Sequence, residues 1–178
     1  TLGGVAREAG GAAARRTRGA PVAIAGQTLA HLALALPAWA LYLIVLPRFY
    51  GFAASRDLFA LVAIAVPFIL AASLIGQIFG GFFRRRETAV ALLLAFGLPL
   101  FFLAGVAWPP EAIPPVIRAL AQAIPSSAGI NAVLHVNQAG ASLGEVRSDW
   151  LHLWLLVAVY AALALAIPRL RRTEDAHA

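Results

Sequence analysis

The chain has 178 residues, of which 61% are hydrophobic and only 12% are charged, and its formal net charge is +6. A soluble domain carries about twice this charged fraction, so the composition excludes an ordinary soluble domain and indicates a polytopic membrane protein. The chain has no cysteine, which excludes a disulfide framework and a thiolate metal site. All basic residues are arginine, and arginines in a membrane protein set its orientation, so we expect no nucleic-acid partner.

Four apolar stretches are each close to the roughly 20 residues that a helix needs to cross a bilayer. They are continuous rather than alternating, which favours helices over strands. We therefore expect an all-α fold with four membrane helices, at about 22–46, 58–83, 88–106 and 150–167. Several of these stretches contain a proline, and in a helix bundle neighbouring helices can satisfy the carbonyl that a proline leaves free.

The segment 107–148, between the third and fourth stretches, has its own pattern. It begins with AWPPEAIPP, in which four prolines fall within seven residues. Two short blocks of apolar residues at helical spacing follow, and each is too short to span a bilayer. We expect a re-entrant hairpin of two short helices on the outer side, which would form a lid. The candidate lid residues are Trp108, Pro109, Pro110, Glu111, Pro114, Pro115 and Pro125.

The ends of these two short helices have sequence signals of their own. Pro114 and Pro115 suit a first helical turn, where the missing N–H costs nothing. Ser126 and Ser127 suit the cap of the second helix, and Gly140 suits its C-terminal end. Glu111 has two interpretations: an outer-gate carboxylate, or an anion that stabilises the N-terminus of its short helix.

The arginines predict the orientation. With the N-terminus in the cytoplasm, more arginines lie inside than outside, as the positive-inside rule requires. The inside residues are Arg7, Arg15, Arg16, Arg18, Arg84, Arg85, Arg86, Arg169, Arg171 and Arg172, and the outside residues are Arg48, Arg56, Arg118 and Arg147. We expect a cytoplasmic segment at 1–21, a membrane domain at 22–168 and a cytoplasmic tail at 169–178. The first residue is threonine with no signal peptide before it, so we also expect a longer chain upstream.

The segment FFLAGVAWPPEAIPPVIRALAQAIPSSAGINAVLHVNQAGASLGEV resembles the ABC-2 type permeases, the membrane subunits of bacterial ABC exporters. The shared pattern is an aromatic-Pro-x-Glu-x-x-Pro element, a short helix, a Pro-Ser pair, a second short helix and a Gly-Ala turn before the last membrane helix. Its residues are Trp108, Pro109, Glu111, Pro114, Pro125, Ser126, Gly140 and Ala141. The stretch IGQIFGGFFRRRETAVALLL looks like the family's loop between its preceding two helices, and the resemblance covers about 21–172.

The resemblance implies the C-terminal part of a six-helix permease in the bacterial inner (plasma) membrane. It implies a second permease copy or a paralogue as partner, a separate ATP-binding-cassette ATPase that binds ATP and Mg, and a periplasmic adaptor as a further candidate. A coupling helix would lie at the N-terminal segment, which departs from the family by being rich in Gly and Ala. The candidate coupling residues are Arg7, Glu8, Arg15, Arg16 and Arg18. The chain has no lysine for a phosphate-binding loop, so we expect it to bind no nucleotide or other cofactor and to be no enzyme.

Two alternative functions stay open. Residues 140–144 match GxSxG, so an intramembrane serine hydrolase could use Ser142 with His152, although a Gly-rich turn has the same pattern. A non-catalytic membrane assembly subunit would also have this composition. His135 lacks the further ligands that a metal site needs, so we expect no metal.

Two sets of residues inside the apolar stretches are candidates for other roles. Gly76, Gly80 and Gly81 have the small-residue spacing that lets helices approach closely, either within the bundle or at a dimer interface. Gln27 and His31 lie one turn apart in the first stretch. Polar side chains within a membrane are expensive, so this pair either borders the transport path or forms a hydrogen bond to a neighbouring helix.

Overall fold

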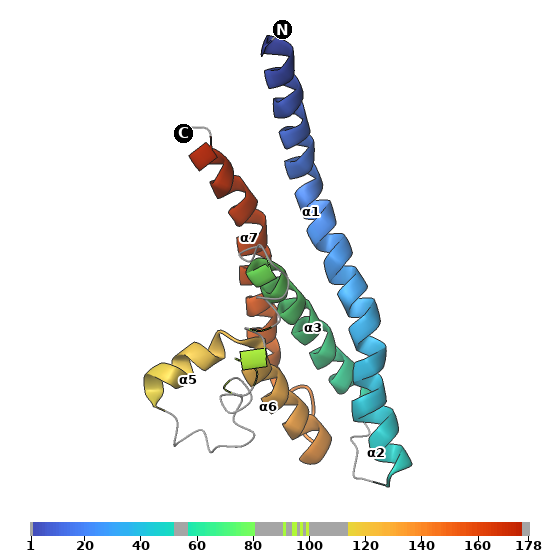
Figure 1. Cartoon of the computed structure of the whole chain (residues 1–178). Helices are drawn as coiled ribbons and strands as arrows, with labels where there is room; N and C mark the ends of the chain where they lie inside the picture. The colour runs from blue at the N-terminus through green and yellow to red at the C-terminus, as the bar shows by residue number, and fades with distance from the viewer. Residues whose placement is uncertain are drawn as a thin grey trace.

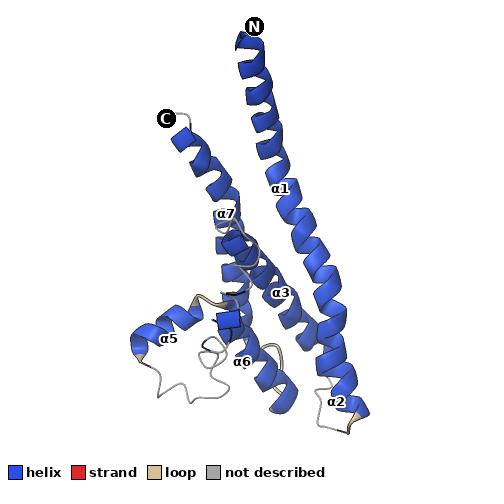
Figure 2. Cartoon of the chain, viewed as in Figure 1, coloured by secondary structure: helices blue, strands red, loops and turns tan. Residues whose placement is uncertain are grey.

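A computed structural model of the chain describes residues 2–51, 57–80, 91, 94, 95, 97, 99 and 114–175. For residues 2–20, 115–118 and 167–175 it describes the backbone. Every regular element in this part of the chain is a helix, which confirms the all-α fold (Figure 2).

The N-terminal third forms one long rod. Helix α1 (Leu2–Ala40) continues into a π-helical segment, η1 (Leu41–Val45), and then into α2 (Leu46–Phe49). Alanine and leucine have high helix propensity, and they carry the helix through the expected boundary at residue 22 without a break. The membrane-compatible part of the rod is Pro21–Phe49. The predicted coupling segment and the first membrane helix are therefore one continuous helix.

The π-helical segment lies between two prolines of this rod. Pro37 is inside α1, and Pro47 follows the segment in the first turn of α2. Leu46 donates its backbone N–H to Leu41, five residues earlier rather than four. Such a widened turn is typical where prolines interrupt the regular hydrogen-bond pattern, and it is frequent at functional sites.

Two further helices are long and apolar enough to cross a membrane. They are α3 (Leu58–Gly80) and the Arg147–Ala166 part of α7 (Arg147–Asp175). Together with Pro21–Phe49 they make three candidate spans among the described residues. Most of the fourth expected helix, 88–106, falls outside the described residues, so it stays a prediction.

Helix α3 is the centre of the bundle and packs against α1, α6 and α7. One group of buried residues joins α3 to α6 and α7 through Leu61, Ile64, Ala132 and Leu153. A second group joins α3 to α7 around Leu74 and its neighbours. Since lipid is as apolar as these side chains, close van der Waals packing rather than the hydrophobic effect holds the helices together.

The two short helices are α5 (Pro115–Gln122) and α6 (Pro125–Gln138). Each begins with a proline in its first turn, which was expected for α5 alone, and Gly140 (φ 69°) ends α6 in the left-handed conformation that glycine tolerates. The prediction that a serine caps α6 is wrong, because the N-cap is Ile124 and makes no side-chain cap bond. Ser127 donates its hydroxyl backwards to the carbonyl of Ala121, which ties α6 to α5 (2.8 Å).

Figure 1 shows how these helices are arranged. The start of α1 and the end of α7 lie at one end of the molecule, and α2 lies at the other. The short helix α5 projects to one side of the bundle formed by α3, α6 and α7.

Candidate functional site

A cluster of four polar side chains lies between α1 and α3. The Nδ1 atom of His31 is 2.7 Å from the hydroxyl oxygen of Ser73. The amide nitrogen of Gln77 donates to the hydroxyl oxygens of both Thr28 (2.9 Å) and Ser73 (3.1 Å). Thr28 in turn donates to the carbonyl of Ile24 (2.8 Å). The four side chains thus form one connected hydrogen-bond network across two candidate membrane spans.

Thr28 and Ser73 are buried between the helices, and His31 lies on the surface of the described bundle. Thr28 and Ser73 are each 8% exposed, whereas His31 is exposed. The sequence of α3 contains no charged residue at all, so this network is the polar feature of an otherwise apolar contact between the helices. Because polar groups within hydrocarbon are costly unless paired, the network is the strongest candidate for a functional site in the described part of the chain.

One polar atom of the cluster has no partner among the residues that the structure describes. The amide oxygen of Gln77 is buried and accepts no hydrogen bond from them. Buried polar atoms are paired in the great majority of cases, and an exception calls for a physical explanation. This free acceptor lies on the same side chain that supplies both donor bonds of the network.

Sequence analysis found one of the four residues of this site. His31 is in the network, but Gln27 is exposed and outside it, so the part of Gln27 in a transport path stays a prediction. Thr28, Ser73 and Gln77 were missed. The last two are four residues apart and therefore on one face of α3, a spacing that could have identified them.

The end of α5 is held by side chains from two other helices. The last carbonyls of a helix lack intrahelical donors and need partners from elsewhere, especially where water is absent. The carbonyl of Gln122 is 2.8 Å from the Nε2 atom of His152 on α7. The neighbouring carbonyl of Ala123 accepts the hydroxyl of Tyr160, also on α7. With the bond from Ser127 to Ala121, three successive carbonyls receive a side-chain partner.

A second contact between helices involves a carbonyl freed by proline. Pro67 lies inside α3 and has no N–H, so the carbonyl of Ala63 loses its normal partner four residues on. The indole N–H of Trp150 on α7 donates to this oxygen over 2.9 Å. The bond connects α7 to α3 at the turn where Pro67 removes a backbone hydrogen bond from α3.

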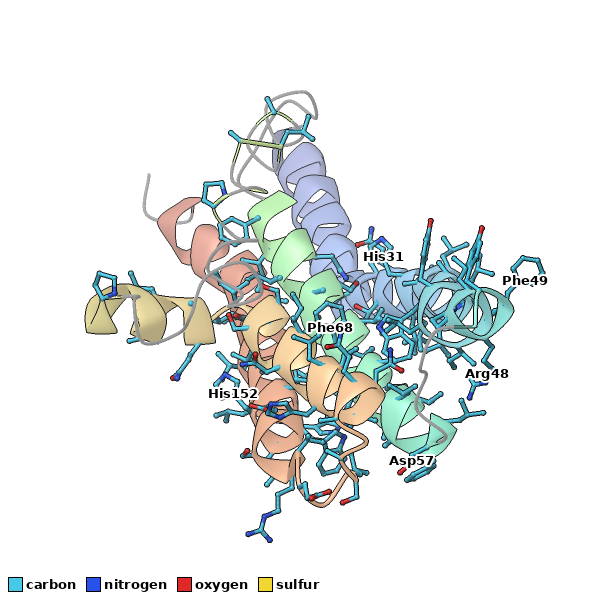
Figure 3. All side chains as sticks on the ribbon, turned by 90° about the horizontal axis from the view of Figure 1, so that it is seen from below. His31, Arg48, Phe49, Asp57, Phe68 and His152 are labelled. Carbon is cyan, nitrogen blue, oxygen red and sulfur yellow. The ribbon has the colours of Figure 1, made fainter. Side chains whose placement is uncertain are left out.

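One close approach of two helices involves a glycine that sequence analysis did not select. A Cβ atom added at Gly129 of α6 would lie 2.5 Å from the ring of Phe68 on α3. Figure 3 shows Phe68 where the ribbons of α3 and α6 meet. At Gly76 and Gly80 an added Cβ atom meets nothing within 4 Å, and Gly81 is outside the described residues. Any packing role of these three glycines would therefore involve a partner other than the described part of this chain.

An apolar cavity of about 210 Å³ lies beside this contact. Its wall includes Trp39 of α1, Leu43 of the π-helical segment, Phe68 of α3 and Val133 of α6. All of its lining residues are apolar. The cavity therefore suits hydrocarbon and offers nothing to a charged group.

Comparison with known families decides the class of protein. A family model described as ABC-2 family transporter protein matches residues 20–166, which is most of the chain. The chain belongs to the ABC-2 transporter family. No curated protein and no solved structure gives a significant match. The chain is therefore a multi-pass membrane protein and a permease subunit of an ABC transporter, in a family whose members normally work with a separate ATPase.

Within this ABC-2 permease, the predicted coupling residues lie on the first half of α1, whose backbone is helical throughout. They are Arg7, Glu8, Arg15, Arg16 and Arg18, and their side chains are outside the described part. Trp108, Pro109, Pro110 and Glu111 of the predicted lid also lie outside the described residues. Pro114, Pro115 and Pro125 are described, and they start α5 and α6.

The permease does not bring the two residues of the alternative serine hydrolase to each other. The hydroxyl of Ser142 donates to the carboxylate of Glu145 (2.8 Å), which also accepts the Ser142 backbone N–H (2.7 Å). His152 instead contacts the carbonyl of Gln122 on α5, and Figure 3 shows it on the α7 ribbon. A nucleophile needs a base within hydrogen-bond reach, and each of these side chains has a different partner. The GxSxG match is a turn before α7.

That turn is stabilised by charge. The backbone N–H and then the hydroxyl of Ser142 hold the pKa of the Glu145 carboxyl below its usual value. The contact has the same form as the carboxylate half of a capping box, in which Glu reaches back to the N–H of a serine three residues earlier, but here it closes a turn before α7. The described residues contain no group of three side chains suited to a metal ion.

Proposed function

We propose that this chain is the permease subunit of an ATP-driven exporter in a bacterial inner membrane. The match to the ABC-2 family over residues 20–166 carries this proposal. In this account a separate ATPase binds ATP and Mg, and the permease works with a second copy or a paralogue. A periplasmic adaptor would be a further partner of the complex.

The continuous first helix suggests how ATPase movement would reach the membrane. Helix α1 has 39 residues, so at a rise of 1.5 Å per residue it is about 58 Å long. A partner that contacts its arginine-rich first half would move the helix as a rod. The movement would then reach the polar cluster, where Thr28 and His31 contact α3.

Helices α5 and α6 are proposed to form the outer lid. Their attachment to α7 rests on the carbonyls at the end of α5, which His152 and Tyr160 contact. A lid held by a few hydrogen bonds and a close glycine contact can have two discrete positions, which is what a switching transporter needs.

The cargo is proposed to be apolar: a lipid, a hydrophobic drug or a hydrophobic peptide. The cavity between α1, α3 and α6 has an entirely apolar wall, and the α3 sequence has no charged residue. A charged substrate would find no countercharge there, and an unpaired charge in hydrocarbon is strongly unfavourable.

Co-purification tests the proposed coupling. The intact permease, extracted gently in detergent, should retain an ATP-binding-cassette ATPase. Replacing Arg15, Arg16 and Arg18 with Glu should weaken that association. Each proposed ion pair with an ATPase carboxylate contributes about 0–1 kcal/mol, and the reversal would turn several such attractions into repulsions together. The same reversal at Arg169, Arg171 and Arg172 is the matched control for total charge. A permease that retains no ATPase under any gentle condition would favour the assembly-subunit alternative.

A further inference from the structure

We propose that the apolar cavity beside Phe68 binds the end of one acyl chain of a bilayer phospholipid. The cavity lies between the N-terminal rod, α3 and α6, and it shares no residue with the polar cluster around His31. The ligand is a lipid of the surrounding membrane, so the proposal does not rest on ATP-driven export.

The wall of the cavity decides the chemistry of its ligand. Every described lining residue is apolar, from Trp39 and Leu43 on the rod to Ile64 on α3 and Val133 on α6. A buried water needs two to four polar partners, and apolar cavities of this kind stay dry. The volume of about 210 Å³ exceeds the roughly 150 Å³ at which an engineered apolar cavity binds benzene. The cavity therefore suits a short piece of hydrocarbon.

The depth of the cavity matches the end of a lipid chain. Ile64 and Phe68 are six and ten residues from the start of α3, which places them about 9 and 15 Å along that helix. Leu43 and Trp39 are likewise six and ten residues from the α2 end of the rod's candidate span. Half of a hydrocarbon core is about 15 Å thick. The cavity therefore extends to the bilayer centre, where the last methylenes of an acyl chain lie.

The direction of the cavity also suits an acyl chain. On the rod and on α3 the lining residues just named are four positions apart, and so are Gly129 and Val133 on α6. Residues at this spacing lie one above the other on a helix face. The cavity thus follows the helix axes, which is also the direction of the acyl chains in a bilayer.

The π-helical segment η1 forms an edge of the cavity that a lipid can reach. Ile64 and Gly129 are buried, whereas Leu43 is partly exposed. Beside Leu43, Tyr42 and Val45 are 67% and 52% exposed. The apolar surface of η1 therefore continues into the cavity, and a chain that contacts this surface can enter without passing a charged group.

The contact between Phe68 and Gly129 keeps one wall of the cavity in place. The ring of Phe68, labelled in Figure 3, packs so closely on α6 that a Cβ atom added at Gly129 would lie 2.5 Å from it. The ring therefore has no room to move further toward the α6 backbone. An empty cavity deprives its wall of van der Waals partners, and a bound chain end restores them.

Photo-crosslinking of the intact chain in a lipid nanodisc tests the site. The nanodisc contains phosphatidylethanolamine and phosphatidylglycerol, with a trace of phosphatidylethanolamine that carries a diazirine near the methyl end of one acyl chain. Mass spectrometry of peptides should locate the label at Trp39, Phe68 and Val133, and also at the exposed Tyr42. A probe with its diazirine near the glycerol should label Trp39 and Phe68 severalfold less, because that part of the lipid does not reach their depth.

Two variants fill the cavity from different walls, Val133→Phe on α6 and Leu43→Phe on the rod. Each should lower the labelling of Trp39 and Phe68 severalfold relative to Tyr42. Val159→Phe is the matched control, since Val159 is exposed on α7 and outside the cavity wall, and it should leave this ratio unchanged. Thermal unfolding verifies that each variant is folded.

A folded Val133→Phe or Leu43→Phe protein with the full labelling ratio would overturn the proposal. Labelling of the original chain at Tyr42 without labelling of Trp39 and Phe68 would also overturn it, because another segment or a second copy would then fill the cavity. The nanodisc contains no ATPase, so these outcomes are independent of the co-purification that tests the exporter proposal.

Discussion

The indole N–H of Trp150 takes the place of the backbone N–H that Pro67 cannot supply. Pro67 leaves the carbonyl of Ala63 free inside α3, and Trp150 donates to it over 2.9 Å from α7. Trp150 also makes an edge-to-face contact with Trp154 on its own helix, at a centroid distance of 6.3 Å. A proline in a membrane helix is therefore compensated here by one identifiable side chain of a neighbouring helix.

Replacing Trp150 with Phe should destabilise the fold by about 1–3 kcal/mol, because the ring remains while the carbonyl of Ala63 loses its donor. Pro67→Ala restores a backbone N–H for that carbonyl. In the Pro67→Ala background, Trp150→Phe should therefore lower the free energy of unfolding by clearly less. Equilibrium unfolding of the four proteins in mixed micelles gives the coupling energy. If the two substitutions change the free energy of unfolding additively, the carbonyl of Ala63 does not link Trp150 and Pro67.

Gly129→Ala should destabilise the contact between α3 and α6 by about 1–3 kcal/mol, as overpacking does in a closely packed core. The added Cβ atom would lie 2.5 Å from the Phe68 ring. Gly76→Ala is the matched control, since nothing lies within 4 Å of a Cβ there and alanine favours a helix. Thermal unfolding in detergent compares the two. A Gly76 variant as unstable as the Gly129 variant would contradict this packing.

The turn before α7 should depend on pH through Glu145. Its pKa in the folded protein is lowered by Ser142, so the stabilisation is fully present above the usual glutamate value of about 4.3. It should be lost as the pH falls through the lowered value. Amide exchange at residues 142–146 should accelerate in that acid range, and in Glu145→Gln this dependence should disappear. Acceleration of the same size in the Gln variant would assign the effect to another group.

The sequence predicted element types better than it predicted contacts. Composition and apolar runs predicted the helices, and Pro114 and Pro115 predicted where α5 begins, whereas α6 begins at Pro125 rather than after a serine cap. Pro67 implied that a carbonyl needed a donor, but Trp150 is separated from Ala63 by 87 positions, and no local pattern reveals such a pair.

The same limit applies to the candidate site. His31 was identified as an intramembrane polar residue, yet its partner Ser73 is 42 positions away. Gln27 looked equivalent to His31, and only the direction in which each side chain projects from α1 distinguishes them. For glycine the spacing rule selected the pair at 76 and 80, whereas the tight helix contact found among the described glycines is at Gly129, which faces an aromatic ring.

The proposed orientation places residue 85 inside and residue 111 outside. The chain has no cysteine, so single cysteines at these positions have no background. A membrane-impermeant maleimide on intact cells should label a cysteine at 111 and spare one at 85, and permeabilised cells should label both. Labelling of 85 alone in intact cells would reverse the topology and remove the basis for an ATPase partner at the N-terminal half of α1.

The rate of ATP hydrolysis in a reconstituted complex tests the central claim most directly. The chain has no lysine for a phosphate-binding loop, so the intact permease alone in nanodiscs should hydrolyse no ATP. Its partner ATPase should hydrolyse ATP at a rate that changes severalfold when the permease is present. The Arg15, Arg16 and Arg18 charge reversal should remove that change. A partner rate that is identical with and without the permease would contradict the account.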